Sequence, residues 1–268
     1  MAGISIIIPY FNRENTIERC LRSIGLGEGH DIEVIIVDDC SAQPLAGFSD
    51  AAIRVFRLPS NMGPVAARAL GASKAGKEFL MFFDSDDELV AGWHARWQGE
   101  VERHPAFDIY GFPDEKYAGG ERFVVAGLDD YWDWVRREER ASDYLITMRA
   151  SAYRSVPMPP VRISEIWYIV QLFERGMKAC YSATPLFRYH QDSGNQLSKK
   201  RFLRLDTSAY TRQSLAYAVN VFRRHRARMK QAALPYHQAW SRRLFKECIL
   251  SLSVASLAAL LWSKDEQQ

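Results

Sequence analysis

Residues 79–89 read FLMFFDSDDEL, and this stretch decides the fold. Its five leading apolar residues predict a β-strand buried on both faces, because a half-buried strand would alternate apolar and polar side chains. The strand is followed at once by Asp84, Asp86 and Asp87. Crowded carboxylates repel one another unless a cation or hydrogen bonds compensate, and such oxygen ligands suit magnesium or manganese bound together with phosphates. The alternative is that these acids only cap the next helix.

The segments before this strand alternate between strand and helix patterns. Apolar, β-branched runs at 4–8, 32–37 and 53–58 predict strands, the first of them ended by Pro9. Residues 17–24 and the alanine-rich segment 65–75 predict helices. This order predicts an α/β fold with a doubly wound, mostly parallel sheet flanked by helices and with ligands at the carboxyl ends of its strands. The loop after the first strand reads PYFNRE rather than GxGxxG, which argues against a dinucleotide-binding fold.

The composition is that of a globular chain. The 268 residues are 47% hydrophobic and 25% charged, and a net charge of +3 is too small to indicate a nucleic-acid partner. The four cysteines are widely scattered, which argues against a zinc site or a disulfide framework and fits a reducing cytoplasm. Pro9 interrupts the first apolar run, and no basic region precedes it, so no signal peptide is expected.

Three motifs occur in one order: SIIIPYFNRENTIERCLRSI, then VIIVDDCS, then NMGPVAARALGASKAGKEFLMFFDSDDEL. Over residues 4–112 the chain resembles the nucleotide-binding half of glycosyltransferase family two. The resemblance implies a GT-A fold, inverting transfer of one sugar, and Asp84-Ser85-Asp86 as a DxD motif. It also implies a divalent metal, manganese or magnesium, that bridges the phosphates of a nucleotide-diphosphate sugar.

The resemblance carries a set of residues over to the nucleotide-sugar site. Phe11 corresponds to an aromatic beside the base, where stacking suits uracil, and the alternative is a core aromatic. Asp39 corresponds to the acid that accepts a hydrogen bond from the uracil imide. Arg68 corresponds to a basic residue near the base or diphosphate, against the alternative of a solvated helix face. The full set is Pro9, Phe11, Asn12, Asp38, Asp39, Arg68, Asp84, Ser85 and Asp86.

The metal ligands implied in the same way are Asp86, Asp87 and His190. A neutral imidazole at His190 would complete the coordination, while the alternative is a surface histidine. The segment ISEIWYIVQLFERG resembles the family's Glu-Asp pair that opens a helix ending ERG, and it places Glu165 at the catalytic base. Here Ser164 replaces the family's glutamate and Glu165 its aspartate. The alternative is that Glu165 only complements the helix dipole.

Tryptophans between the two halves of the chain are candidates for acceptor binding. Trp132, Trp134 and Trp167 could stack on the apolar face of a sugar, although aromatics at helical spacing more often belong to a core. The absence of a QxxRW motif at 190–240 favours transfer of a single sugar over polymerisation.

The domain prediction is a catalytic domain at 1–196 and a helical extension at 197–268. Within the first, 1–112 is the nucleotide-sugar half and 113–196 the acceptor half. The extension is basic and ends in an apolar stretch at 248–262 that is too short to cross a bilayer. It could lie on anionic headgroups at the inner face of the plasma membrane, or pack on the catalytic domain or on a second subunit in a homodimer.

These inferences together predict a metal-dependent glycosyltransferase of bacterial surface polysaccharide synthesis. Its donor would be a UDP-sugar and its acceptor a glycan or polyprenyl-linked sugar. Two alternatives stay open: a nucleotide-sugar-binding module without activity, suggested by the Ser164-Glu165 departure, and a nucleotidylyltransferase, which would want a glycine-rich loop after the first strand.

Overall fold

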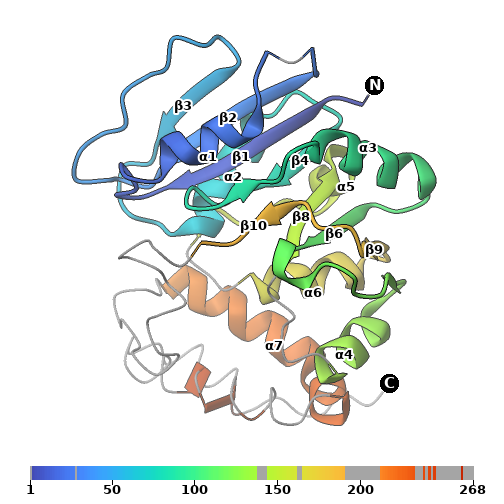
Figure 1. Cartoon of the computed structure of the whole chain (residues 1–268). Coiled ribbons are helices and arrows are strands. Elements are labelled where there is room, and N and C mark those ends of the chain that lie inside the picture. Colours follow the sequence, from blue (N-terminus) through green and yellow to red (C-terminus); the bar gives the residue numbers. More distant parts are fainter. Residues whose placement is uncertain are drawn as a thin grey trace.

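The computed structural model describes residues 2–27, 29–137, 144–161, 165–190 and 212–232, with single positions at 238, 241–242, 244–245 and 261. An eight-stranded sheet in the order β3-β2-β1-β4-β8-β6-β9-β7 forms its centre, and helices cover both faces (Figure 1). The predicted α/β class with a mostly parallel sheet is confirmed.

The first half of the sheet is parallel throughout. Its strands are β1 (Ile4–Tyr10), β2 (Ile32–Asp38), β3 (Ile53–Arg57) and β4 (Phe79–Phe82), linked by α1 (Ile17–Ile24) and α2 (Pro64–Lys74). Every one of these elements was predicted. The prediction that Pro9 ends the first strand is wrong, because the ladder continues to Tyr10, whose carbonyl accepts the Asp39 N–H at 2.8 Å.

Successive side chains of the strands point to opposite faces of the sheet and belong to two hydrophobic cores. Ile6 and Ile8 of β1 pack with α1 and with α3 (Trp93–Arg103) on one face, whereas Ile7 packs with α2 on the other. All five residues of the 79–83 run are buried, as a strand covered on both faces requires. Gly71 lets α2 approach the sheet closely, since a Cβ there would lie 2.5 Å from Ile7 Cγ2.

The second half of the sheet is mixed. β8 (Tyr144–Arg149) lies antiparallel between β4 and β6 (Ile109–Pro113), and β9 (Ala179–Tyr181) pairs with β6 and with β7 (Phe123–Val125). A separate ribbon pairs β5 (Glu88–Leu89) with β10 (Phe187–Arg188). Among the residues described before position 190, the remaining elements are the 3-10 turn η1 (Glu115–Tyr117), α4 (Leu128–Arg137), α5 (Ala150–Ser155) and α6 (Ile166–Glu174).

The extension begins, in its described part, with α7 (Arg212–Ala232), which packs along α4 and α6 (Figure 1). Its apolar face, with Leu215, Val219 and Phe222, is buried in the same core as α6. The described part of the extension thus packs on the catalytic domain, which was one of the predicted alternatives. Most of the apolar stretch at 248–262 lies outside the described residues. Among those described, no helix is long and apolar enough to cross a bilayer.

Candidate active site

The acids of the DSDD turn lie directly after β4, at the carboxyl ends of the parallel strands. Asp86 and Asp87 are buried, whereas the side chain of Asp84 is 48% exposed. Arg13 Nη2, from the loop after β1, lies 3.3 Å from Asp86 Oδ2, and Arg19 donates to the Asp86 carbonyl at 2.8 Å. Ser85 is buried, and its carbonyl accepts the hydroxyl of Thr16 at 2.9 Å. The turn is therefore held by the segment that follows β1.

Burial raises the pKa of Asp87 to about 9, and the negative charges of Asp84 and Asp86 act in the same direction. A hydrogen bond from the His190 N–H opposes them. Asp84 pairs with Arg68 and Asp86 with Arg13, so Asp87 is the acid of this turn whose negative charge its surroundings oppose. Carboxylate oxygens are ligands that magnesium and manganese prefer, and a divalent cation would offset the repulsion among these acids. The residues present therefore fit such a cation.

His190 lies beside these acids, but its ring is directed elsewhere. Its backbone N–H donates to Asp87 Oδ1 at 3.2 Å, while ring Nε2 lies 2.5 Å from Glu88 Oε2. Within the described ranges, Asp86, Asp87 and His190 do not bring three ligand atoms within 4.8 Å of one another. Their role as joint metal ligands stays a prediction, and it requires the imidazole to turn from Glu88.

A cavity of about 290 Å³ opens beside the turn. It brings together four of the predicted residues, Arg68, Asp84, Asp87 and Glu165. Arg68, on α2, is 8% exposed, so the alternative of a solvated helix face is wrong. Its Nη2 lies 2.5 Å from Asp84 Oδ1, and its Nη1 forms an ion pair with Glu165 Oε1. Glu165 stands at the N-terminus of α6, and Gly176, with a φ of 79°, follows two residues after the end of that helix. Ser164 lies outside the described residues.

The same cavity has lining residues that the sequence analysis missed. Asp114 and Lys116 follow β6, and Tyr144, Tyr168 and Tyr189 add aromatic surface. Asp114 is buried, and its carboxylate accepts the N–H groups of Lys116 at 2.7 Å and Tyr189 at 2.9 Å. An acid at the end of an apolar strand was the available signal, as it was for Asp84. The tyrosines offered none, because they come together only in the folded chain.

The residues predicted to bind the base gather at the ends of β1 and β2. Phe11 is 39% exposed, so the core alternative is wrong and its ring is accessible. Pro9 pairs with Val37 across the two strands, and Asn12, with a φ of 50°, accepts the Ala42 N–H at 2.9 Å. The carboxylate of Asp39 accepts N–H groups from Met62 and Gly63 at 2.6 and 2.8 Å.

Asp38 requires a correction. It is 1% exposed, and its carboxylate accepts the Ser41 N–H at 2.8 Å and pairs with Arg57. Burial raises its pKa, but these hydrogen bonds and the Arg57 charge outweigh burial and lower it. A carboxylate enclosed in this way holds the loop after β2, and it is not available to a nucleotide.

The acceptor role of the three tryptophans is also wrong. Trp132 and Trp167 are fully buried and Trp134 is 8% exposed. Trp132 and Trp134 lie on α4, which packs against α7, and Trp167 meets Phe222 of α7 edge-on with ring centres 6.2 Å apart. No face of these rings remains for a sugar.

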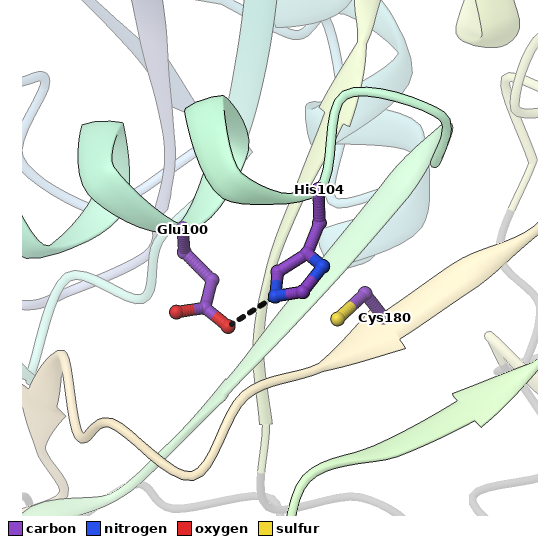
Figure 2. A group of neighbouring side chains, drawn as sticks. All are labelled: Glu100, His104 and Cys180. Atoms are coloured by element: carbon purple, nitrogen blue, oxygen red, sulfur yellow. Dashed lines mark ion pairs between the residues drawn. The ribbon is translucent and has the colours of Figure 1, made fainter.

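A second group of titratable side chains lies away from the cavity: Glu100, His104 and Cys180, with ligand atoms within 4.8 Å of one another (Figure 2). Glu100 is fully buried, and Arg103 and Arg122 each pair with it at 2.8 Å. Burial raises the pKa of the Cys180 thiol, and the charge of Glu100 adds to this effect. A metal ion here would meet two guanidinium groups and a protonated thiol, so we assign Glu100 to its ion pairs.

Comparison with known proteins shows the family of the chain. Residues 5–156 match the profile of glycosyl transferase family 2, which covers more than half of the chain. The chain belongs to this family. The fold resembles that of S. aureus TarS 1-349, crystallised in complex with UDP-GlcNAc, with a TM-score of 0.62 at 18% identity over 97% of this chain and 79% of that one.

Two relatives show where the sequence similarity lies. The succinoglycan biosynthesis protein ExoO of Rhizobium meliloti is 34% identical over 90 residues, which cover 32% of this chain and 26% of that protein. The GalNAc(5)-diNAcBac-PP-undecaprenol beta-1,3-glucosyltransferase of Campylobacter jejuni is 34% identical over 100 residues, or 34% of this chain and 32% of that protein. The chain thus spans about a quarter to a third of the length of these relatives.

Proposed function

We propose that this protein is an inverting, metal-dependent glycosyltransferase that moves one sugar from a UDP-sugar to a hydroxyl of a glycan or lipid-linked acceptor. The observation that carries the proposal is the cavity after β4. There Asp84 and Asp87 of the DSDD turn lie across from Glu165, with Arg68 between them. A buried arginine, beside acids that could hold a divalent cation, suits a diphosphate on one side, and a half-exposed carboxylate on the other suits a general base.

In the proposed reaction Glu165 accepts the proton of the acceptor hydroxyl as that oxygen bonds to the anomeric carbon. The bond from this carbon to the diphosphate oxygen breaks on the opposite face, so the configuration inverts. A divalent cation held by Asp86 and Asp87, with His190 beside them, would neutralise charge on the leaving diphosphate. Arg68 shares the diphosphate charge, and Phe11 offers an exposed ring on which a base can stack.

The choice of substrates rests on relatives. TarS was crystallised with UDP-GlcNAc and with UDP, which supports a uridine donor here. The Campylobacter jejuni relative is named for an undecaprenol-linked glycan and the Rhizobium meliloti relative for succinoglycan, which supports an acceptor in surface polysaccharide synthesis. Tyr144 and Tyr189 are half-buried aromatic side chains of the cavity lining that could contact a sugar.

A thermal-shift panel of nucleotide sugars with and without manganese tests the proposal. UDP-sugars with manganese should raise Tm, and the sugar that raises it most identifies the donor. Release of the sugar from that donor separates an enzyme from a module that only binds. A panel in which no nucleotide sugar changes Tm would contradict the proposed function.

Peripheral membrane contact is a further part of the proposal. Arg223 and Lys230 are exposed on α7, on the side away from its buried face, where they could meet anionic headgroups. Sedimentation with vesicles that contain an anionic lipid tests this contact, and absence of binding at low salt would contradict it.

A further inference from the structure

Arg68 connects the two sides of the cavity. Its Nη2 donates to Asp84 on the donor side at 2.5 Å, and its Nη1 forms an ion pair with Glu165 on the acceptor side. The arginine side chain is 10% exposed, whereas those of Asp84 and Glu165 are 48% and 47% exposed. One buried cation thus holds two accessible carboxylates that belong to different parts of the proposed reaction.

This arrangement occupies the proposed base. A carboxylate that is paired with a guanidinium is a weaker proton acceptor for a substrate hydroxyl, because the cation stabilises its ionised form. Glu165 begins α6 and has no side-chain hydrogen bond to the helix N-terminus, so the helix itself does not fix its carboxylate. The ion pair with Arg68 is the contact that sets its position in the described part of the chain.

A diphosphate is a strong competitor for this arginine. It carries more negative charge than a carboxylate, and the guanidinium fork matches phosphate oxygens in two-bonded geometry. Arg68 also has a buried Nε that makes no hydrogen bond with the described residues, which leaves one donor for a further acceptor. The diphosphate of the proposed donor would arrive beside Asp84, which Arg68 already contacts.

We propose that donor binding moves Arg68 from Glu165 to the diphosphate, so that the base is released only when a donor is present. The inference rests on the proposed function and adds a positioning role for Arg68. It links donor binding to the availability of the base: without donor Glu165 is held by the arginine, and with donor it is free to face the acceptor hydroxyl. The linkage also runs in reverse, since Glu165 competes with the donor for Arg68 and weakens donor binding.

A double-mutant cycle in UDP affinity, measured by titration calorimetry with manganese present, tests the competition. Glu165→Gln should bind UDP about 3- to 10-fold more tightly than the wild type, because the neutral amide competes poorly for Arg68. Arg68→Ala should bind more weakly. Added to Arg68→Ala, Glu165→Gln should change the affinity by less than about 2-fold. In a background of Arg68→Lys, which keeps the positive charge, Glu165→Gln should again tighten UDP binding, but by less than in the wild type.

Glu78→Gln is the matched control, because Glu78 pairs with Arg149 at 3.1 Å just before β4, at the opposite end of that strand from Asp84. It should leave UDP affinity unchanged.

Should Arg68→Ala fail to fold, Arg68→Met, which fills the volume of the arginine stem, takes its place in the cycle. An unchanged or weaker affinity in Glu165→Gln would overturn the inference. So would equal tightening with and without Arg68, which would show simple charge repulsion. A wild type that binds no UDP would contradict the proposed function itself.

Discussion

Gly71→Ala perturbs the close contact that positions α2 against the sheet. Arg68 lies one turn earlier on the same helix, so its position depends on this contact. The added Cβ would lie 2.5 Å from Ile7 Cγ2 and 3.3 Å from Val37 Cγ2. Ile7 is fully buried and β-branched, so it cannot turn aside easily. Overpacking costs about 1–3 kcal/mol, and a contact as close as 2.5 Å to a fixed side chain places this substitution at the upper end, about 2–3 kcal/mol. Alanine recovers about 1 kcal/mol of helix propensity. We expect a net loss of about 1–2 kcal/mol and a fall in Tm of about 2–8 °C.

Thermal unfolding of Gly71→Ala beside Gly99→Ala checks this reasoning. Gly99 lies inside α3, where the nearest atom to an added Cβ is the far end of Arg103 at 3.3 Å. The same substitution there should stabilise by about 0.5–1 kcal/mol. Because α2 must move away from β1, Gly71→Ala should also weaken UDP binding, while Gly99→Ala should not. A Tm for Gly71→Ala at or above that of the wild type would refute the close-packing argument.

Three further changes have definite expected results. Glu165→Gln should lower kcat for sugar transfer by about 10²- to 10⁴-fold, since it removes the proposed proton acceptor; turnover near the wild-type rate would exclude Glu165 as the base. Trp132→Phe should lower stability by about 1–2 kcal/mol and leave the KM for acceptor unchanged, because the ring is fully buried; a raised KM with unchanged Tm would restore the acceptor role. Burial, aided by His30, lowers the pKa of His94, so the unfolded chain protonates first as pH falls below 6.5 and stability is lost there. Tm should therefore drop less between pH 7 and pH 5.5 in His94→Phe than in the wild type, and equal drops would exclude His94 as a source of the loss.

The parallel half of the fold could be predicted from the sequence because its signals are local. A strand buried on both faces appears in the sequence as a continuous apolar run. The acids at the ends of β2 and β4 mark the carboxyl ends of these two strands, where α/β sheets bind ligands. Asp84, Asp87 and Glu165 were assigned from such signals and from the family resemblance, and the cavity contains all three. Their chemical roles stay predictions.

The remaining features depend on contacts between distant segments. The tryptophans of α4 carry no local signal that separates a core role from a binding role. The packing of α4 against α7, and of Trp134 against Phe123 and Tyr181, decides between them. The antiparallel placement of β8 between β4 and β6 has no local signal either. The same is true of the ion pair between Arg68 and Glu165, which joins two helices far apart in the chain. Asp38 and Asp39 are adjacent and chemically alike, yet Arg57 and Ser41 hold the first, whereas the Met62 and Gly63 N–H groups hold the second.

The most direct test of the proposed site is calorimetry with UDP, with and without manganese, on the wild type and on a variant with alanine at positions 84, 86 and 87. We expect the wild type to bind UDP more tightly when manganese is present, and the variant to lose this dependence while its Tm shows that it is folded. Equal, manganese-independent binding by both proteins would contradict the claim that this turn holds a cation against a diphosphate.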